Sequence, residues 1–261
     1  LETERVVIPP KNRRRSSRNT SPRRPGLMKF GHWWWALPGI ILVIAIHYVA
    51  TSIGGFFAFT DWTGIGNFQI VGFDNFAKIF SDPTKIGAVW NTLLLAFLSV
   101  ILTNIIGLAL ALGLNRMVKS RYILRALFFM PVVLSPLATS YIWKFIFDFN
   151  GPINGALRAV GLDQFVTSWL ANPDTAIWAV LIVLVWQQTG FSMVIYMAGL
   201  AAVPVEIEEA GAIDGANIWQ RFTNIVVPSI RPAIAIATTL GLVNGLRIFD
   251  PILALTGGGP A

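Results

Sequence analysis

The sequence predicts an all-α polytopic membrane protein with five spanning helices. Of its 261 residues, 54% are hydrophobic and only 13% are charged, and the mean hydropathy is +0.63. A soluble domain carries about 25% charged residues, so the composition alone indicates a membrane protein. Five apolar segments reach the roughly 20 residues that a helix needs to cross a bilayer core. Alternation at period two is weak, which disfavours a β-barrel.

The predicted spans are separated by loops that contain charged residues and turn formers. They cover residues 33–59, 90–114, 127–147, 176–203 and 232–255. The first opens on three tryptophans, which suit the membrane interface, and Pro131 and Pro136 predict a kink in the third. The fifth leads into TGGGP, a turn sequence, so we expect a sixth helix beyond residue 261.

Residues 1–32 are predicted to form a basic, disordered tail. They hold nine of the 20 Lys and Arg, together with Pro and Ser and few apolar residues. Such a tail suits anionic lipid and helps to fix topology. We therefore expect no nucleic-acid binding, although the net charge is +7.

The charges of the loops predict the orientation of the spans. The loop at 115–126 carries four Lys and Arg, and the loop at 204–231 carries two. By the positive-inside rule, the N-terminus and both of these loops are expected to lie in the cytoplasm. The spans and their loops, residues 33–261, are predicted to form one transmembrane domain. The charged residues of the two opposite loops are Lys78, Lys85, Arg158, Asp61, Asp74, Asp82, Asp148, Asp163 and Asp174.

The residues that the chain lacks exclude several kinds of site. There is no Cys, so disulfides and thiolate metal sites are excluded, and the two His lie far apart. No G-x-x-x-x-G-K-[ST] loop for nucleotide phosphates is present. We expect no catalytic site, metal or cofactor in this chain.

The stretch EEAGAIDGANIWQRFTNIVVP, residues 208–228, places carboxylates and small residues between two apolar spans. Pro204 suits the first turn of a helix, and Asp214-Gly215 suits its end. A second short helix follows, so the loop at 204–231 is predicted to be a helix–turn–helix unit. Its apolar faces contain Ile207, Ala210 and Ile213 in the first helix, and Trp219, Phe222 and Val226 in the second.

Two interpretations of this loop differ in what it contacts. An amphipathic loop lying on lipid normally carries Lys and Arg on its polar face. The first helix here is acidic, with Glu206, Glu208 and Glu209 near its N-terminus, and an anionic leaflet would repel it. Docking on another protein is therefore favoured over docking on lipid.

The same loop resembles the EAA loop of permeases from ABC importers. That motif reads E-A-A, three residues, G, nine residues, I-x-L-P, and its form in sugar permeases reads E-A-A-x-I-D-G-A. The departures are Gly211 for the second Ala and Val227 for Leu, and Gly211 should weaken the helix by roughly 1 kcal/mol relative to Ala. The matching residues are Glu209, Ala210, Ile213, Asp214, Gly215, Ala216, Phe222, Ile225 and Pro228.

Other segments resemble maltose-type carbohydrate permeases. They are VGFDNFAKIF at 71–80, WNTLLLAF at the start of the second span, and RIFDPILALTGGGPA at 247–261. The likeness covers roughly residues 30–261 and leaves out the basic tail. It implies the type I ABC-importer architecture with six core helices, in the cytoplasmic membrane of a bacterium or archaeon.

The resemblance also implies partners and roles. The partners would be a second permease subunit, a dimer of ATPase subunits that binds ATP and magnesium, and an extracytoplasmic solute-binding protein. The resemblance favours a second permease that is a different chain. The loop at 204–231 would couple the permease to the ATPase, which drives alternating access. Glu209 would make a polar contact in the ATPase socket, Gly215 the sharp turn, and Ala210 with Ile213 the face that the socket buries.

Polar residues within the spans are candidates for the solute path, because an unpaired polar group in lipid is costly. Gln188 and Asn244 are expected to face a common path, where an amide can both donate to and accept from a sugar hydroxyl. For each residue the alternative is a hydrogen bond between helices, and Arg247 and Asp250, three apart, are expected to pair. The candidates are Gln187, Gln188, Asn244, Arg247 and Asp250.

Three functions are compared. An ATP-driven importer of a sugar or oligosaccharide accounts for the motif, the topology and the missing ATP site, with glycerol phosphate or another polyol as the alternative solute. An ion-coupled secondary transporter would show midplane charges and inverted repeats, and neither is evident. A membrane enzyme would need a convergent acid, base or metal cluster, and the chain offers none.

Overall fold

The computed structural model of the chain describes residues 33–115 and 120–259. The chain divides into two units, Leu1–Lys78 and Ile79–Ala261. The described residues are helical apart from turns, loops and one isolated bridge between Thr60 and Ile70. The predicted all-α fold is therefore confirmed, whereas the predicted basic tail at 1–32 lies outside the described residues.

The first unit contains one span-length helix. It starts as a 3₁₀ turn at Trp33–Ala36 and continues through α1 (Leu37–Val43), a π-helical segment at Ile44–Val49 and α2 (Ala50–Phe57). Residues Trp34–Phe57 are long and apolar enough to cross a membrane, as the sequence predicts for 33–59. The amphipathic helix α3 (Asp74–Ser81) runs across the boundary between the units.

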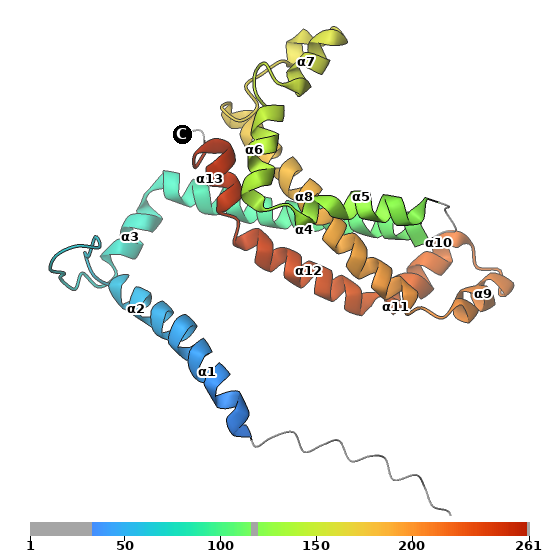
Figure 1. Cartoon of the computed structure of the whole chain (residues 1–261), viewed down its shortest axis with the longest axis horizontal. Coiled ribbons are helices and arrows are strands. Elements are labelled where there is room, and N and C mark those ends of the chain that lie inside the picture. The colour runs from blue at the N-terminus through green and yellow to red at the C-terminus, as the bar shows by residue number, and fades with distance from the viewer. Residues whose placement is uncertain (1–32, 116–119, 260–261) are drawn as a thin grey trace, which may run out of the picture. The chain divides into compact units, whose positions relative to one another are not determined.

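Two long helices form the centre of the second unit (Figure 1). These are α4 (Pro83–Asn115) and α8 (Pro173–Ala201), and both qualify as spans. Asn172 caps α8 by accepting a hydrogen bond from the N–H of Asp174, and Pro173 occupies its first turn. Because both helices are continuous and apolar enough to cross a membrane, the predicted spans at 90–114 and 176–203 are confirmed, although α8 ends at Ala201.

The third predicted span is two helices rather than one kinked helix. The chain forms α5 (Arg121–Val133) and α6 (Pro136–Ile146), which are bent by 100° across a break of two residues. The residue before a proline avoids the helical region, and Ser135 is extended with ψ of 145°. Ser135 then caps α6 by accepting from the N–H of Ala138.

The fifth predicted span is also interrupted. Helix α12 (Arg231–Leu246) ends four residues before α13 (Asp250–Thr256) begins. Pro251 explains the break, since it lacks the N–H that would bond the carbonyl of Arg247. The single helix predicted for 232–255 is therefore wrong between residues 247 and 249.

The connection between α6 and α8 has its own core. It contains α7 (Pro152–Ala159) and a 3₁₀ turn at Asp163–Phe165. Asn154, fully buried, donates to the carbonyls of Phe149 and Thr167 at 3.1 and 2.8 Å. It also accepts from the indole N–H of Trp169 at 2.8 Å, so one side chain ties both ends of this segment together.

The spans pack through small residues and buried apolar clusters. One cluster joins α4, α8 and α13 around Leu95, Val183 and Leu255, and a second joins α4, α8 and α12 around Met193 and Ile230. A hydrogen bond from the Tyr196 hydroxyl of α8 to Asn104 of α4 lies in the second region. Membrane helices associate in this way, with close packing and interhelical hydrogen bonds in place of a hydrophobic drive.

Gly107→Leu is expected to destabilise the bundle, because α4 and α8 touch at this glycine. A Cβ at Gly107 would lie 2.8 Å from the Cβ of Ser192 and 3.0 Å from the backbone nitrogen of Met193. Overpacking of this kind costs about 1–3 kcal/mol. Gly113→Leu on the same helix is the matched control, since its Cβ would meet nothing within 4 Å. Thermal unfolding in detergent tests this, and equal midpoints for the two variants would contradict the packing described.

Candidate functional site

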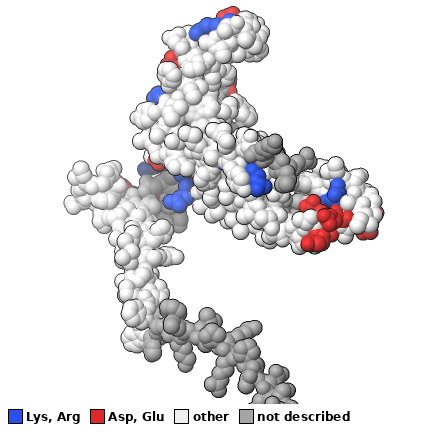
Figure 2. Space-filling model, turned by 45° about the vertical axis from the view of Figure 1, so that its right-hand side comes forward, with Lys and Arg blue, Asp and Glu red and all other residues white. Residues whose placement is uncertain are grey.

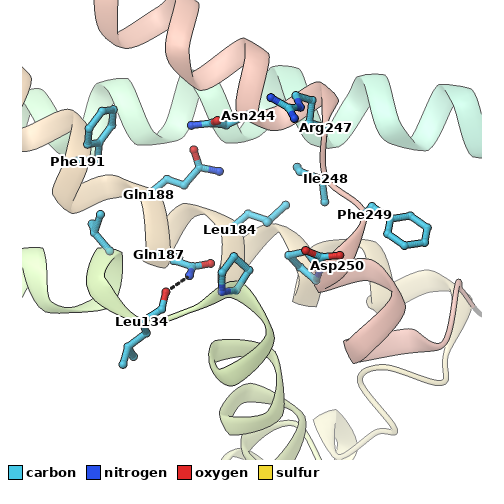
Figure 3. A pocket seen from close by; sticks show the side chains of 13 residues that line it. Leu134, Leu184, Gln187, Gln188, Phe191, Asn244, Arg247, Ile248, Phe249 and Asp250 are labelled. Atoms are coloured by element: carbon cyan, nitrogen blue, oxygen red, sulfur yellow. Dashed lines mark hydrogen bonds between the residues drawn. The ribbon is translucent and has the colours of Figure 1, made fainter. Parts of the chain in front are cut away.

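A cavity of about 630 Å³ lies where the two interrupted spans pass α8 (Figure 3). Polar and apolar groups share its wall. All five residues that the sequence singles out for a solute path line this cavity. The lining residues are Val132, Leu134, Pro136, Leu184, Gln187, Gln188, Phe191, Asn244, Arg247, Ile248, Phe249, Asp250 and Pro251.

Gln187 is bound to the break between α5 and α6. Its side-chain nitrogen donates to the Leu134 carbonyl at 3.1 Å and to the Thr139 hydroxyl at 3.3 Å. Figure 3 shows the amide of Gln187 directed at Leu134. The nitrogen of Gln187 therefore makes a hydrogen bond between helices, which is the alternative to a role in the solute path.

Gln188 and Asn244 face the cavity with free amides. Gln188 comes from the middle of α8 and Asn244 from the last turn of α12, and Figure 3 shows both side chains at the same side of the cavity. Neither amide makes a hydrogen bond to another described residue, whereas the amide of Gln187 makes two. Two free amides can each donate to and accept from a polyhydroxylated ligand.

Arg247 and Asp250 do not form the ion pair that their spacing predicts. Arg247 is the C-terminal cap of α12 and Asp250 is the first residue of α13, so they are not successive positions on one helix face. Both are described and exposed, and no salt bridge within 4.0 Å joins them. The prediction fails because it assumed a continuous helix through Pro251.

Several lining groups were not identified from the sequence. Phe191 and Phe249 add aromatic surface to the wall, and the break adds the carbonyl of Leu134. Apolar residues in a span carry no signal that separates cavity lining from packing. Pro251 is the signal that was available, because a proline next to Asp250 indicates a break at this point.

The loop at 204–231 is a helix–turn–helix unit, as the sequence predicts. Helix α9 (Val205–Ile213) is followed by a continuous helix from Ile218 to Ser229, which comprises α10 (Ile218–Arg221), a π-helical segment at Phe222–Val226 and α11 (Val227–Ser229). Asn217 and Gln220 form a reciprocal capping box at its start, each accepting at 2.8 Å from the other's N–H.

Gly215 makes possible the turn between α9, the first arm of the unit, and the helix Ile218–Ser229, its second arm. The N–H groups of Gly215 and Ala216 donate to the carbonyls of Ala212 and Gly211 at 3.2 and 2.9 Å, which is the Schellman pattern. Gly215 has a φ of +82°, a left-handed conformation that glycine adopts without penalty. Asp214 is the C-terminal cap of α9.

Gly211 allows the arms to approach each other. A Cβ at this position would lie 2.6 Å from Cδ1 of Ile225 and 3.6 Å from Cγ of Arg221. Ile225, Phe222 and Pro228 are half-buried in the second arm, and Val226 and Ile230 are seated in the α4–α8–α12 cluster. The second arm is thus fixed to the bundle.

The first arm, in contrast, has no buried residue. Its acidic side chains gather at the end of the second unit where α9 lies (Figure 2). Glu209, Ala210, Ile213, Asp214 and Gly215 are exposed, and Ile213 is 86% exposed. The helix–turn–helix unit also exposes large apolar residues beside these carboxylates. They are Val205, Ile207, Ile213, Ile218 and Trp219. Such a mixture is typical of a surface that contacts protein.

Among the described residues, no group of three or more His, Asp or Glu is placed to hold a metal ion. The polar groups of the cavity are amides, one guanidinium and one carboxylate. They can bind and orient a solute, and they offer no nucleophile with an adjacent base.

Comparison with known proteins covers most of the chain. Residues 103–260 match the family described as binding-protein-dependent transport system inner membrane component. A protein named "Probable starch degradation products transport system permease protein AmyD", from Thermoanaerobacterium thermosulfurigenes, is 33% identical over 241 residues, which are 91% of this chain and 81% of AmyD. The multiple sugar-binding transport permease MsmF of Streptococcus mutans is 36% identical over 238 residues, with the same two shares.

A solved structure agrees with the fold. A chain of a bacterial ABC transporter that imports the acidic polysaccharide alginate has a TM-score of 0.73 and 27% identity, and the match covers 85% of this chain and 76% of that one. A structure of a bacterial alginate ABC transporter in complex with an alginate pentasaccharide-bound periplasmic protein matches with the same TM-score and identity. The resemblance seen in the EAA loop is confirmed across the bundle, and the chain belongs to the family of inner-membrane permease components of binding-protein-dependent ABC importers.

Proposed function

We propose that this chain is the permease subunit of an ATP-driven importer of a sugar or oligosaccharide, and that the cavity at the two breaks is its part of the solute path. The observation that carries the proposal is the convergence of Gln188, Asn244, Arg247 and Asp250 on one cavity between interrupted spans. Within a membrane, irregular backbone is tolerated only where it is buried in protein or lines a water-filled cavity, so the two breaks support an aqueous path at this point.

The chemistry of the cavity suits a neutral, hydroxyl-rich solute. Two free amides supply donors and acceptors, while Phe191 and Phe249 supply apolar surface for ring faces. The relatives named for saccharides support this class, and they include the trehalose/maltose permease MalF of Thermococcus litoralis, 32% identical over 224 residues. A polyol such as glycerol phosphate is the alternative solute, and Arg247 is the cation that would bind its phosphate.

The loop at 204–231 is proposed to dock in a groove of a partner ATPase, which binds ATP and magnesium. The exposed acidic and apolar side chains of α9 support this role, since they have no partner in the chain's own core. Glu209 is assigned to a polar contact with the ATPase, and Ala210 with Ile213 to the face that becomes buried there. The loop and the N-terminus are proposed to lie in the cytoplasm.

A continuous path of contacts connects this loop to the cavity and supports alternating access. The helix Ile218–Ser229 meets α12 at a bend of 68°, and Ile230, at the bend, is 1% exposed among residues of α8 and α12. Helix α12 carries Asn244 into the cavity at its other end. A displacement of the loop by the ATPase is therefore transmitted along α12 to the solute path.

The remaining partners follow from the family. A second permease, proposed to be a different chain, completes the pathway, and an extracytoplasmic solute-binding protein delivers the sugar. Membership in a family of binding-protein-dependent systems disfavours the ion-coupled secondary transporter.

Purification of the tagged full-length protein from its own membranes in mild detergent tests the proposal. The expected result is recovery of an ATPase and a second permease with the tagged chain. Recovery of this chain alone, with uptake that follows ion gradients and is insensitive to ATP depletion, would contradict it.

A further inference from the structure

The break between α5 and α6 leaves a backbone carbonyl without its helical hydrogen bond inside the membrane. Pro136 lacks an N–H, and the chain turns by 100° at residues 134–135. The carbonyl of Leu134 therefore has no helical donor four residues later, since Ala138 donates to the Ser135 side chain instead. In a bilayer such a group must find a partner within the protein.

Gln187 supplies that partner from a different helix. Its nitrogen binds Leu134 on one side of the break and Thr139 in the first turns of α6 on the other. Thr139 is fully buried, so water does not compete for its hydroxyl. The neighbours of Gln187 along α8 are fixed, because Val185, Thr189 and Gly190 are buried and Gly190 lies against the backbone of Phe128 in α5.

We propose that Gln187 is a positioning residue that sets the angle between α5 and α6 and so shapes the cavity, rather than a residue that recognises the solute through its N–H groups. Both donors of the amide are used in the two bonds across the break. Neighbouring Gln188 lines the same cavity without any such bond. The consequence for solute transport rests on the proposed function, whereas the consequence for the angle does not.

The absence of cysteine allows a direct test by spin labelling. Met130→Cys in α5 and Tyr141→Cys in α6 place two labels on exposed positions on either side of the break. The distance between the labels is measured in the full-length chain in lipid nanodiscs without added solute, together with its co-purifying partners after any cysteine in them has been replaced. In Gln187→Leu we expect the distribution of distances between the two labels to be about 2-fold wider than in the parent. The substitution removes the side-chain nitrogen that α8 donates to both sides of the break, so the angle between α5 and α6 is held less tightly. Gln188→Leu is the matched control and should leave the width unchanged.

Thr139 provides a second test that does not alter α8. Thr139→Val removes one of the two acceptors with little change of shape, and it should widen the distribution, whereas Thr139→Ser keeps the hydroxyl and should restore the narrow one. In uptake assays with the assembled transporter, Gln187→Leu should lower the maximal rate more than it raises the half-saturating sugar concentration.

Two results would overturn the inference. One is an unchanged distance distribution in both Gln187→Leu and Thr139→Val. The other is a Gln187→Leu variant whose only defect is a raised half-saturating concentration, which would assign the residue to solute recognition. If the parent transporter imports no sugar while the label distances respond as expected, the proposed function fails and the positioning role stands.

Discussion

Gly215→Val is expected to remove the partner ATPase from the purified complex and to lower ATP-driven uptake by at least 10-fold. Gly215 has a φ of +82°, and an L-residue pays roughly 1–2 kcal/mol in the left-handed region, more when it is β-branched. A penalty of 1.4 kcal/mol corresponds to about a factor of 10 in the equilibrium constant for forming the turn. Since the turn sets the angle between α9 and the second arm, its loss should displace Glu209 and Ile213 from the proposed ATPase socket. Co-purification and uptake by the reconstituted transporter measure the effect.

Gly161→Val is the matched control for this substitution. Gly161 follows α7 with a φ of +75°, and the same Schellman pattern surrounds it, with Gly161 and Leu162 donating to Arg158 and Leu157 at 3.1 and 2.8 Å. Beyond the adjacent residues, no atom lies within 4 Å of a Cβ built at either glycine, so both valines introduce backbone strain without a clash. Retention of the ATPase by Gly161→Val, together with its loss from Gly215→Val, assigns the effect to the coupling loop. Equal retention in both would refute the assignment.

The double variant Gln188→Leu/Asn244→Leu is expected to lose about 25-fold in uptake efficiency, the maximal rate divided by the half-saturating concentration. A hydrogen bond to a neutral group contributes about 1 kcal/mol, and thus roughly 5-fold for each amide. The two residues are on different helices and share no direct bond, so about 25-fold is the loss expected if each amide binds the solute independently, and a deviation from the product would measure their coupling through the shared cavity. Uptake of radiolabelled sugar, with ATPase co-purification to confirm assembly, provides the measurement.

Thr239→Val tests whether the loss of any polar side chain from α12 lowers the uptake efficiency. Thr239 is exposed on α12, five residues before Asn244, and does not line the cavity. It should transport normally. If Asn244→Leu transports as well as Thr239→Val while the complex remains intact, the cavity is not the solute path.

The sequence predicts the uninterrupted helices well, and the reason is physical. In α4 and α8 the apolar run is long and contains no internal proline, so the requirement to span the bilayer determines the helix. The turn at Gly215 was equally predictable, because Asp-Gly after a short helix matches the left-handed C-terminal cap that the structure shows.

The interrupted spans were harder to predict, because the same apolar composition serves a continuous and a broken helix. In the sequence, Pro136 predicts a kink, whereas in the structure it begins a new helix at 100° to the first. Pro251 breaks the fifth span, and this break separates Arg247 from Asp250. A break is stable in lipid only if tertiary contacts bind the freed carbonyls, as Gln187 binds that of Leu134, and such contacts join residues 53 positions apart.

The central claim, that this chain moves sugar under the control of a partner ATPase through the loop at 204–231, is tested most directly in proteoliposomes. The transporter is purified with its partners, reconstituted, and supplied with ATP on the side of the loop and with sugar-loaded binding protein on the other. The account predicts accumulation of sugar against its gradient that requires both ATP and the binding protein and that Gly215→Val abolishes. Accumulation that persists without ATP, or that Gly215→Val leaves unchanged, would contradict it.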